Sequence, residues 1–319
     1  MKKILSAVFF IIPKIFYAQS AEHETAPVVP MLYSKVNINT GFRERDFALS
    51  PDGTEIFYTL QSPKGNFQAI IYLKKDAKGK WSHPEVAPFS GKFTDLEPAF
   101  TIDGEKLFFV SNRPITGTGI KDFDIWFVEK KDNTWGQPQN LGEPVNSTSN
   151  EFYPSVCANG NLYFTAAGRN SNGQEDIYVS VFTNGKYGDA IPLDTAINSG
   201  ADEFNAFIAP DDQFIIFSSY GRKDDKGGGD LYMSKKDAAG KWMPAKNLVF
   251  LNSDKLDYCP FVSFDRQSFF FTSERHVLQN SFQDKPATYS RLLKEYSSVL
   301  NGGGNIYWVS FDEVLKNLN

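Results

Sequence analysis

Histidine and cysteine are scarce in this sequence: its 319 residues include three histidines and two cysteines. His23 falls near the start of the chain, and His83 and His276 are too far apart to form the short ligand spacings of a zinc site. Cys157 and Cys259 either form one disulfide or remain two buried thiols. We expect no bound metal and no cofactor.

Other enzyme signatures are missing as well. The sequence contains no Gly-x-Ser-x-Gly elbow. A phosphate-binding loop lies between the end of a strand and the start of a helix, and neither of the glycine triplets at 227–229 and 302–304 is placed in this way. The loop 223–230 offers carboxylates for calcium, but its lysines compete with the ion and its spacing fits no calcium loop. These patterns predict no catalytic residue.

The longest apolar run lies at the start of the chain, Ile4–Ile12, directly after two lysines. A basic start, a short apolar run and a small residue such as Ala18 are typical of a secretory signal peptide. The run is too short to span a membrane as a mature helix. We expect a signal peptide over 1–18 with cleavage after Ala18, a tail over 19–30 and a single domain over 31–319. The mature protein should then be periplasmic or secreted, without membrane insertion.

Basic residues are outnumbered by acidic ones, and the formal net charge is −5. Residues 1–18 contain three lysines and no acids, so the mature protein would carry −8. An acidic surface argues against nucleic acids and anionic membranes as partners.

An acidic residue recurs along the sequence at intervals of 51, 56, 52 and 54 residues. A turn follows each acid, and an apolar, mostly aromatic segment follows each turn. The five acids are Glu44, Asp95, Glu151, Glu203 and Asp257. A repeat of this length, built from short strands and turns, indicates a β-propeller with one repeat per blade. We predict an all-β fold, a five-bladed β-propeller with four-stranded antiparallel blades.

The repeats also predict how the ring closes. An apolar-Asn-Ser/Thr tripeptide precedes four of the acids, and its first copy, Ile38-Asn39-Thr40, places the end of a blade at the start of the chain. The last repeat stops after its third strand, near Val309. We predict that residues 31–36 supply the missing fourth strand, because a closed ring leaves no exposed sheet edge.

One insertion, 276–303, interrupts the fifth repeat between its second and third strands. Within it, Pro286–Leu300 has apolar residues at helical spacing, and Gly302 ends the pattern. Connections at this position emerge on the same face as the connections between blades. We predict a helix that covers or rims this loop-rich face.

The repeat resembles the TolB-type propeller repeat of bacterial envelope proteins, which is WD-repeat-like and carries a Pro-Asp-Gly turn. The shared pieces are Glu-x₇-Asp-Gly, an aromatic second strand, Asp-Ile-Tyr at the third strand, and Ser-x-Arg in Ser111-Asn112-Arg113 and Ser273-Glu274-Arg275. The resemblance spans residues 38–310, although the first repeat lacks the arginine and the aspartate. It implies the fold and a place in the cell envelope. Members of the family include binding and scaffolding proteins, and related propellers form parts of enzymes.

Charges that recur in every blade are expected to hold that blade together through ion pairs and hydrogen bonds. Besides the five acids, this set contains Arg113, Arg169, Arg222, Arg275, Asp124, Asp176 and Asp230. Positions at which the repeats differ are better candidates for binding.

The register two residues after each acid differs from repeat to repeat. Its members are Asp46, Glu97, Tyr153, Asn205 and Cys259. They should begin the innermost strands, and a varied polar ring at the mouth of a channel suits a ligand. Arg45 also departs from its register, where the other repeats have apolar or aromatic residues, and it either reaches the mouth or pairs with Asp46 or Glu97. We predict ligand or partner binding by Arg45, Asp46, Glu97, Tyr153 and Asn205.

The function predicted from these features is that of a monomeric envelope binding or scaffold protein. Its loop-rich face and channel mouth would engage an envelope protein or a glycan. The alternative is a carbohydrate-active hydrolase that uses Asp46 and Glu97 as paired carboxylates.

Overall fold

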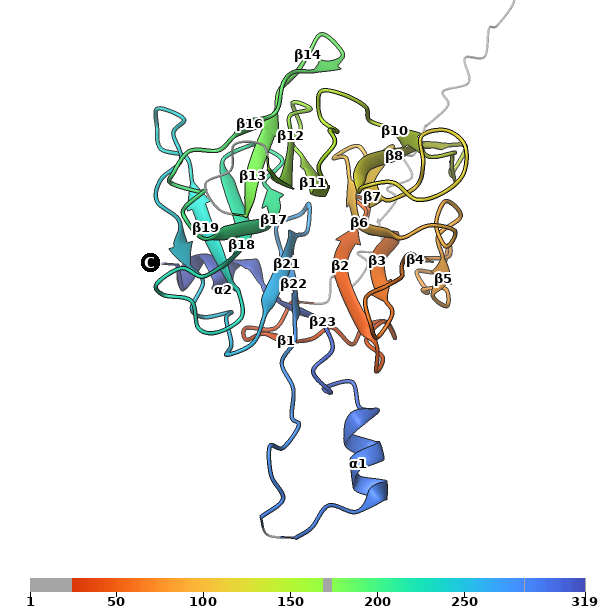
Figure 1. Ribbon diagram of the computed structural model, residues 1–319, viewed down its shortest axis with the longest axis vertical. Coiled ribbons are helices and arrows are strands. Elements are labelled where there is room, and N and C mark those ends of the chain that lie inside the picture. Colours follow the sequence, from red (N-terminus) through yellow and green to blue (C-terminus); the bar gives the residue numbers. More distant parts are fainter. Residues whose placement is uncertain (1–24, 169–173, 284, 319) are drawn as a thin grey trace, which may run out of the picture.

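The computed structural model describes residues 25–168, 174–283 and 285–318. These residues form a ring of five antiparallel sheets, and β2, β6, β11, β17 and β21 surround its centre (Figure 1). The predicted all-β, five-bladed propeller is therefore confirmed. The expected signal peptide, residues 1–18, and the repeated Arg169 lie outside the described residues.

Each blade contains four strands in order from the centre outward. Blade 1 consists of β2 (Arg43–Leu49), β3 (Glu55–Gln61), β4 (Gln68–Lys74) and β5 (Glu85–Val86). Blade 2 consists of β6 (Asp95–Phe100), β7 (Lys106–Ser111), β8 (Asp124–Lys131) and β10 (Gln139–Asn140), with β9 (Thr134–Trp135) paired to β8. Blade 3 consists of β11 (Glu151–Val156), β12 (Leu162–Ala167), β13 (Glu175–Ser180) and β16 (Ile191–Pro192), with a separate hairpin of β14 (Phe182–Thr183) and β15 (Lys186–Tyr187). Blade 4 consists of β17 (Asp202–Ile208), β18 (Phe214–Tyr220), β19 (Asp230–Lys235) and β20 (Lys246–Asn247). Blade 5 consists of β21 (Asp257–Val262), β22 (Ser268–Ser273), β23 (Asn305–Ser310) and β1 (Met31–Leu32).

The apolar-Asn-Ser/Thr tripeptide connects successive blades through its two polar side chains. In the copy before blade 3, Asn146 Oδ1 accepts from the backbone N–H of Ile125, and Nδ2 donates to the carbonyl oxygen of the same residue, both at 2.9 Å. The next residue, Ser147, donates its hydroxyl to Glu151 Oε1 at 2.6 Å. The tripeptide therefore links the third strand of one blade to the acid that begins the next.

In the described part of the protein, the recurrent arginines pair with the recurrent acids of their own blades. Arg113 lies 2.6 Å from Asp95, Arg222 lies 2.8 Å from Glu203, and each of these arginines also donates to a backbone carbonyl oxygen in the preceding loop. Arg275 pairs with Asp257 in the same way, at 3.1 Å. This agrees with the structural role expected for the repeated charges.

The ring closes through the N-terminal segment, as predicted. Met31 and Leu32 pair antiparallel with Trp308 and Tyr307 of β23. Asn39 then repeats the contact of the other tripeptides: its Oδ1 accepts from the N–H of Ile306 at 2.7 Å, and its Nδ2 donates to the carbonyl oxygen of that residue at 3.0 Å. The first and last repeats are thereby joined by the same interactions that join neighbours.

The insertion differs from the prediction. Its helix, α1 (Tyr289–Tyr296), is shorter than expected and begins after the N-cap Thr288, whose side chain accepts from the N–H of Arg291. None of its residues is buried, and it projects beyond the edge of the ring in Figure 1 instead of covering a face. The reason lies at its base, where a bridge between His276 and Asn301 forms a two-stranded stem and Asn301 donates to the carbonyl oxygen of Gly41 at 2.9 Å.

A second helix, α2 (Phe311–Lys316), was not predicted. It packs Phe311 and Val314 into the core, where Phe311 stacks on Phe214 with ring centroids 5.5 Å apart. Neither helix, and these are the two in the described part of the chain, has the length and apolar composition to cross a membrane. Cys157 and Cys259 are both buried free thiols, so the thiol alternative holds.

Candidate functional site

A β-bulge interrupts the innermost strand of every blade. In each bulge the register with the next strand shifts, and the residue two positions after the acid has a positive φ between 49° and 59°. These residues are Asp46, Glu97, Tyr153, Asn205 and Cys259. Residues other than glycine seldom adopt this conformation, and a bulge of this kind redirects a side chain. Here it turns all five side chains inward, and each is buried.

The five inward side chains contact one another and Arg45. Arg45 Nε lies 2.8 Å from Asp46 Oδ1, and its Nη2 lies 2.9 Å from Glu97 Oε1. Asn205 Nδ2 donates to the same Glu97 oxygen at 3.4 Å, and Cys259 Sγ lies 2.8 Å from Asp46 Oδ1. The predicted polar ring therefore exists, but it fills the channel and bonds to itself where an open mouth was expected. We call these six residues the polar plug.

Glu97 is the central acceptor of the plug because blade 2 lacks a hydroxyl that other blades have. The bulge N–H of Glu97 bonds to Thr59 Oγ1 at 3.0 Å, and that of Asn205 bonds to Thr165 Oγ1 at 3.1 Å. The equivalent position in blade 2 is Val110, which offers no acceptor. The N–H of Tyr153 instead bonds to Glu97 Oε2 at 2.7 Å.

Two carboxyl groups share one guanidinium in the plug, so the cluster would be one positive charge short if both were ionised. Burial and, less strongly, the charge of Asp46 raise the pKa of Glu97 to about 8, although Arg45 opposes the shift. Burial also raises the pKa of the Cys259 thiol, so this thiol keeps its proton and donates to Asp46. The other oxygen of Asp46, Oδ2, is buried without a hydrogen-bond partner among the described residues. The plug is thus sensitive to the charge of Glu97.

Glu97→Gln should change how stability depends on pH. In the folded protein Glu97 titrates near 8, whereas in the unfolded state it titrates near its ordinary value of 4.5. The folded state therefore holds an extra proton between these values, and the free energy of unfolding should fall as the pH rises through this window. Urea unfolding from about pH 5 to about pH 9 should show this decline in the wild type and a flatter profile in Glu97→Gln. Glu105→Gln, at an exposed acid, is the control and should keep the wild-type slope; equal slopes in all three proteins would contradict the assignment.

An open pocket lies directly above the plug, on the face that carries the loops between blades. It has a volume of about 340 Å³. Its floor contains Glu97 and Asn205, and its walls come from the register one residue after each acid. The lining residues are Arg45, Gln68, Leu96, Glu97, Phe123, Phe152, Thr165, Glu175, Phe204, Asn205, Leu256 and Tyr258. We call this the loop-face pocket.

The structure divides the predicted site residues between two environments. Arg45, Glu97 and Asn205 line the loop-face pocket, whereas Asp46 does not. Tyr153 lines a narrow cavity of about 40 Å³ on the other side of the plug, and its hydroxyl donates to the carbonyl oxygen of Pro260 at 3.1 Å. The alternative for Arg45 is resolved, since it both pairs with the two acids and reaches the pocket. The binding role of the five residues stays a prediction.

Sequence reasoning missed the aromatic walls of the pocket. Phe152, Phe204 and Tyr258 occupy the register of Arg45, which looked apolar and therefore structural. The signal was the departure of Arg45 from that register, because an arginine among aromatic residues marks a position close to solvent. Glu175 was missed because it begins β13 without any repeated counterpart.

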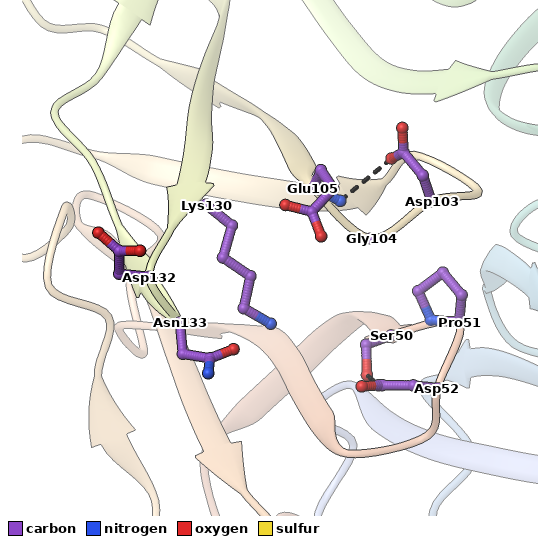
Figure 2. Close-up of a pocket in the computed structure, with 9 residues that line it drawn as sticks. All are labelled: Ser50, Pro51, Asp52, Asp103, Gly104, Glu105, Lys130, Asp132 and Asn133. Atoms are coloured by element: carbon purple, nitrogen blue, oxygen red, sulfur yellow. Dashed lines mark hydrogen bonds between the residues drawn. The ribbon is translucent and has the colours of Figure 1, made fainter.

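A larger hollow on the opposite face is less suited to a ligand. Figure 2 shows this hollow, of about 400 Å³, between the turns of blades 1 and 2. Its acids form hydrogen bonds within their own turns; Asp103, for example, accepts from the N–H of Glu105 at 3.1 Å. The base that lines it, Lys130, pairs with Glu55 at 2.7 Å. It has no aromatic wall. Within the described ranges, no group of three or more histidines, cysteines or acids is arranged to hold a metal.

Comparisons with known proteins place the fold and nothing finer. No protein-family model matches the sequence, and no curated protein matches it either. Among solved structures, a protein described as TolB from Agrobacterium tumefaciens is 14% identical, with 84% of this protein and 90% of that one covered and a TM-score of 0.48. An α-L-arabinofuranosidase from Lactobacillus brevis is 12% identical over 90% of this protein and 92% of its own length, with a TM-score of 0.47. A BT0996–RGII complex is 9% identical over 90% and 92% of the two proteins, with a TM-score of 0.56. Of these three, the BT0996–RGII complex has a TM-score above 0.5, and at 9% identity that likeness shows the fold alone.

Proposed function

We propose that this protein is a binding protein of the cell envelope that holds its partner, a protein or a glycan, in the loop-face pocket. The observation that carries the proposal is the arrangement of an open, aromatic-walled pocket above a sealed polar floor. Small-ligand sites are typically concave and apolar with a few placed polar groups. Aromatic side chains and arginine also supply much of the energy at protein interfaces.

The same floor argues against the alternative of a hydrolase with paired carboxylates. A general acid or a nucleophile must reach the reacting atoms of a bound substrate. Both oxygens of Glu97 already accept hydrogen bonds within the plug, and Asp46 Oδ1 accepts from Arg45 and Cys259. Asp46 also does not line the pocket. Binding without turnover is therefore the better reading of this site.

We also propose that the protein acts in the periplasm or outside the cell. The support is the signal-peptide pattern of residues 1–18. An export assay of the whole protein, with the cleavage position read by mass spectrometry of the mature N-terminus, tests this. Mature protein that begins at Gln19 supports the proposal, and full-length protein retained in the cytoplasm contradicts it.

Phe204→Ala should abolish most of the binding at the loop-face pocket. Phe204 is half-buried and contributes a wall of the pocket, so its loss should weaken partner binding by about tenfold or more while changing stability little. The measurement is equilibrium binding to a panel of envelope glycans and envelope proteins, with the products analysed for hydrolysis. Phe42→Ala is the matched control, since Phe42 is an exposed phenylalanine that does not line the pocket.

Two results would contradict the proposed function. Binding that is equally strong in the wild type and in Phe204→Ala would place the site elsewhere on the protein. Glycan turnover that disappears in Asp46→Asn or Glu97→Gln would make the protein a hydrolase.

A further inference from the structure

Glu175 places an unpaired carboxylate in the loop-face pocket. It is half-buried at the start of β13, and within the described residues its carboxylate has neither an ion pair nor a hydrogen bond. The nearby Asp202 is already engaged, because its Oδ1 accepts from the N–H of Gln174 at 2.9 Å. Burial, followed by the charge of Asp202, raises the pKa of Glu175, although the charge of Arg45 opposes the shift. A partly buried charge without a partner is costly, so a counter-charge at this position would be stabilising.

The charges around the pocket are mostly negative. Arg45 is shared by Asp46 and Glu97 and has no charge left over for a ligand. At the rim, Glu274 is partly buried near Tyr258, and burial raises its pKa despite the opposing effect of Arg43 and Arg45. Besides Glu97, which holds its proton at neutral pH, the acids of this region are Asp46, Glu175, Asp202 and Glu274, against the bases Arg43 and Arg45. A concave site lined by charges of one sign concentrates ligands of the opposite sign.

The aromatic walls are suited to the same ligands. Phe123 and Phe152 lie with ring centroids 5.3 Å apart beside the pocket, and Phe204 stands on the same wall register as Phe152. Tyr258 already receives a cation, since the guanidinium carbon of Arg45 lies 5.2 Å from its ring centroid. Aromatic faces attract ammonium and guanidinium groups, and their edges pack against alkyl stems.

We propose that the loop-face pocket recognises an ammonium or guanidinium group carried on an apolar stem, with Glu175 as its charge partner and the aromatic walls around the stem. This inference rests on the proposed function, whose pocket it uses. The cationic group can belong to a free amine or to a lysine or arginine side chain of a protein partner. Both present the same chemistry to Glu175.

Calorimetric titration with four small probes tests the charge preference. Agmatine and cadaverine supply the cations, 1-pentanol is the neutral probe and pentanoate is the anion. The two cations should bind at least about tenfold more tightly than either other probe. Added salt should weaken the binding of the cations. Glu175→Gln should lower the affinity for the cations about tenfold and leave the affinity for 1-pentanol unchanged. Asp254→Asn is the control, because Asp254 is an exposed acid of the loop before β21 that does not line the pocket.

A peptide with one central arginine separates the two sources of the cation. Tighter binding of the peptide than of agmatine supports a protein partner, and equal binding supports a free amine. Neutral or anionic probes that bind as well as the cations, or cation binding that survives Glu175→Gln, overturn the inference. Neutral glycans that bind and are lost in Phe204→Ala, without any cation binding, overturn the inference but leave the proposed function standing. If no probe or partner loses binding in Phe204→Ala, both are overturned.

Discussion

Arg45→Met should lower the free energy of unfolding by about 3–5 kcal/mol, because it leaves buried carboxylates without their cation. Arg45 pairs with Asp46 at 2.8 Å and with Glu97 at 2.9 Å, and the side chains of both acids are almost fully buried. Methionine retains much of the side-chain volume and none of the charge. Chemical denaturation near neutral pH measures the loss.

An exposed ion pair provides the control for this variant. Arg266 and Asp211 lie 2.5 Å apart on the opposite face, and each side chain is 45% exposed. Water screens such a pair, so Arg266→Met should cost no more than about 1 kcal/mol. If the two variants are equally destabilised, the plug does not depend on the charge of Arg45, and the description of the plug is wrong.

Removal of residues 19–39 should abolish cooperative unfolding or cause aggregation. This deletion removes β1 and Asn39, and so leaves β23 as an unpaired sheet edge. It also removes Tyr33, whose ring contacts Phe47, Phe270 and Trp308 with centroids 5.3 Å away in each case. Thermal unfolding monitored by circular dichroism, together with light scattering, measures both effects.

Two point variants show whether the closure itself matters. Tyr33→Ala should cost about 3–5 kcal/mol, since it truncates a buried aromatic side chain. Met31→Ala should change stability by about 0.5 kcal/mol or less, because Met31 is exposed and its backbone pairing remains. Normal melting and solubility of the deletion variant would contradict the closed ring.

The fold could be predicted from the sequence because the same interactions recur from blade to blade. An acid such as Glu151 is buried against the tripeptide before it, and that requirement leaves a fixed spacing in the sequence. The tripeptide at Asn39 also predicted the closure of the ring, since no blade precedes this copy in the sequence. A feature that occurs only once cannot be predicted from the repeats. The outward direction of α1 depends on contacts of Asn301 and Gly41 that have no counterpart in other blades.

The candidate site was predicted only in part, for a related reason. The varied polar register does converge at the centre of the ring, but its sequence gives no sign of the positive φ at Asp46 and its equivalents. That conformation turns the side chains toward one another and consumes their hydrogen-bonding capacity. The open cavity is therefore lined by the neighbouring register instead. There, Phe152 and Phe204 resemble ordinary core residues in the sequence. Whether such a residue faces a blade or a cavity depends on the width of the ring, which no local pattern records.

The contact of Asn39 with Ile306 also has a consequence for the order in which the protein folds. These residues are 267 positions apart, whereas the equivalent asparagine contacts of blades 2, 3 and 4 span 21 positions. Blades 1 to 4 can each form as their own strands leave the ribosome, because their contacts are local. The fifth cannot be completed until β23 has been synthesised, so residues 31–39 stay unpaired until then. A protein truncated before β23 would keep an open ring, and its free strand edges would expose it to aggregation and proteolysis.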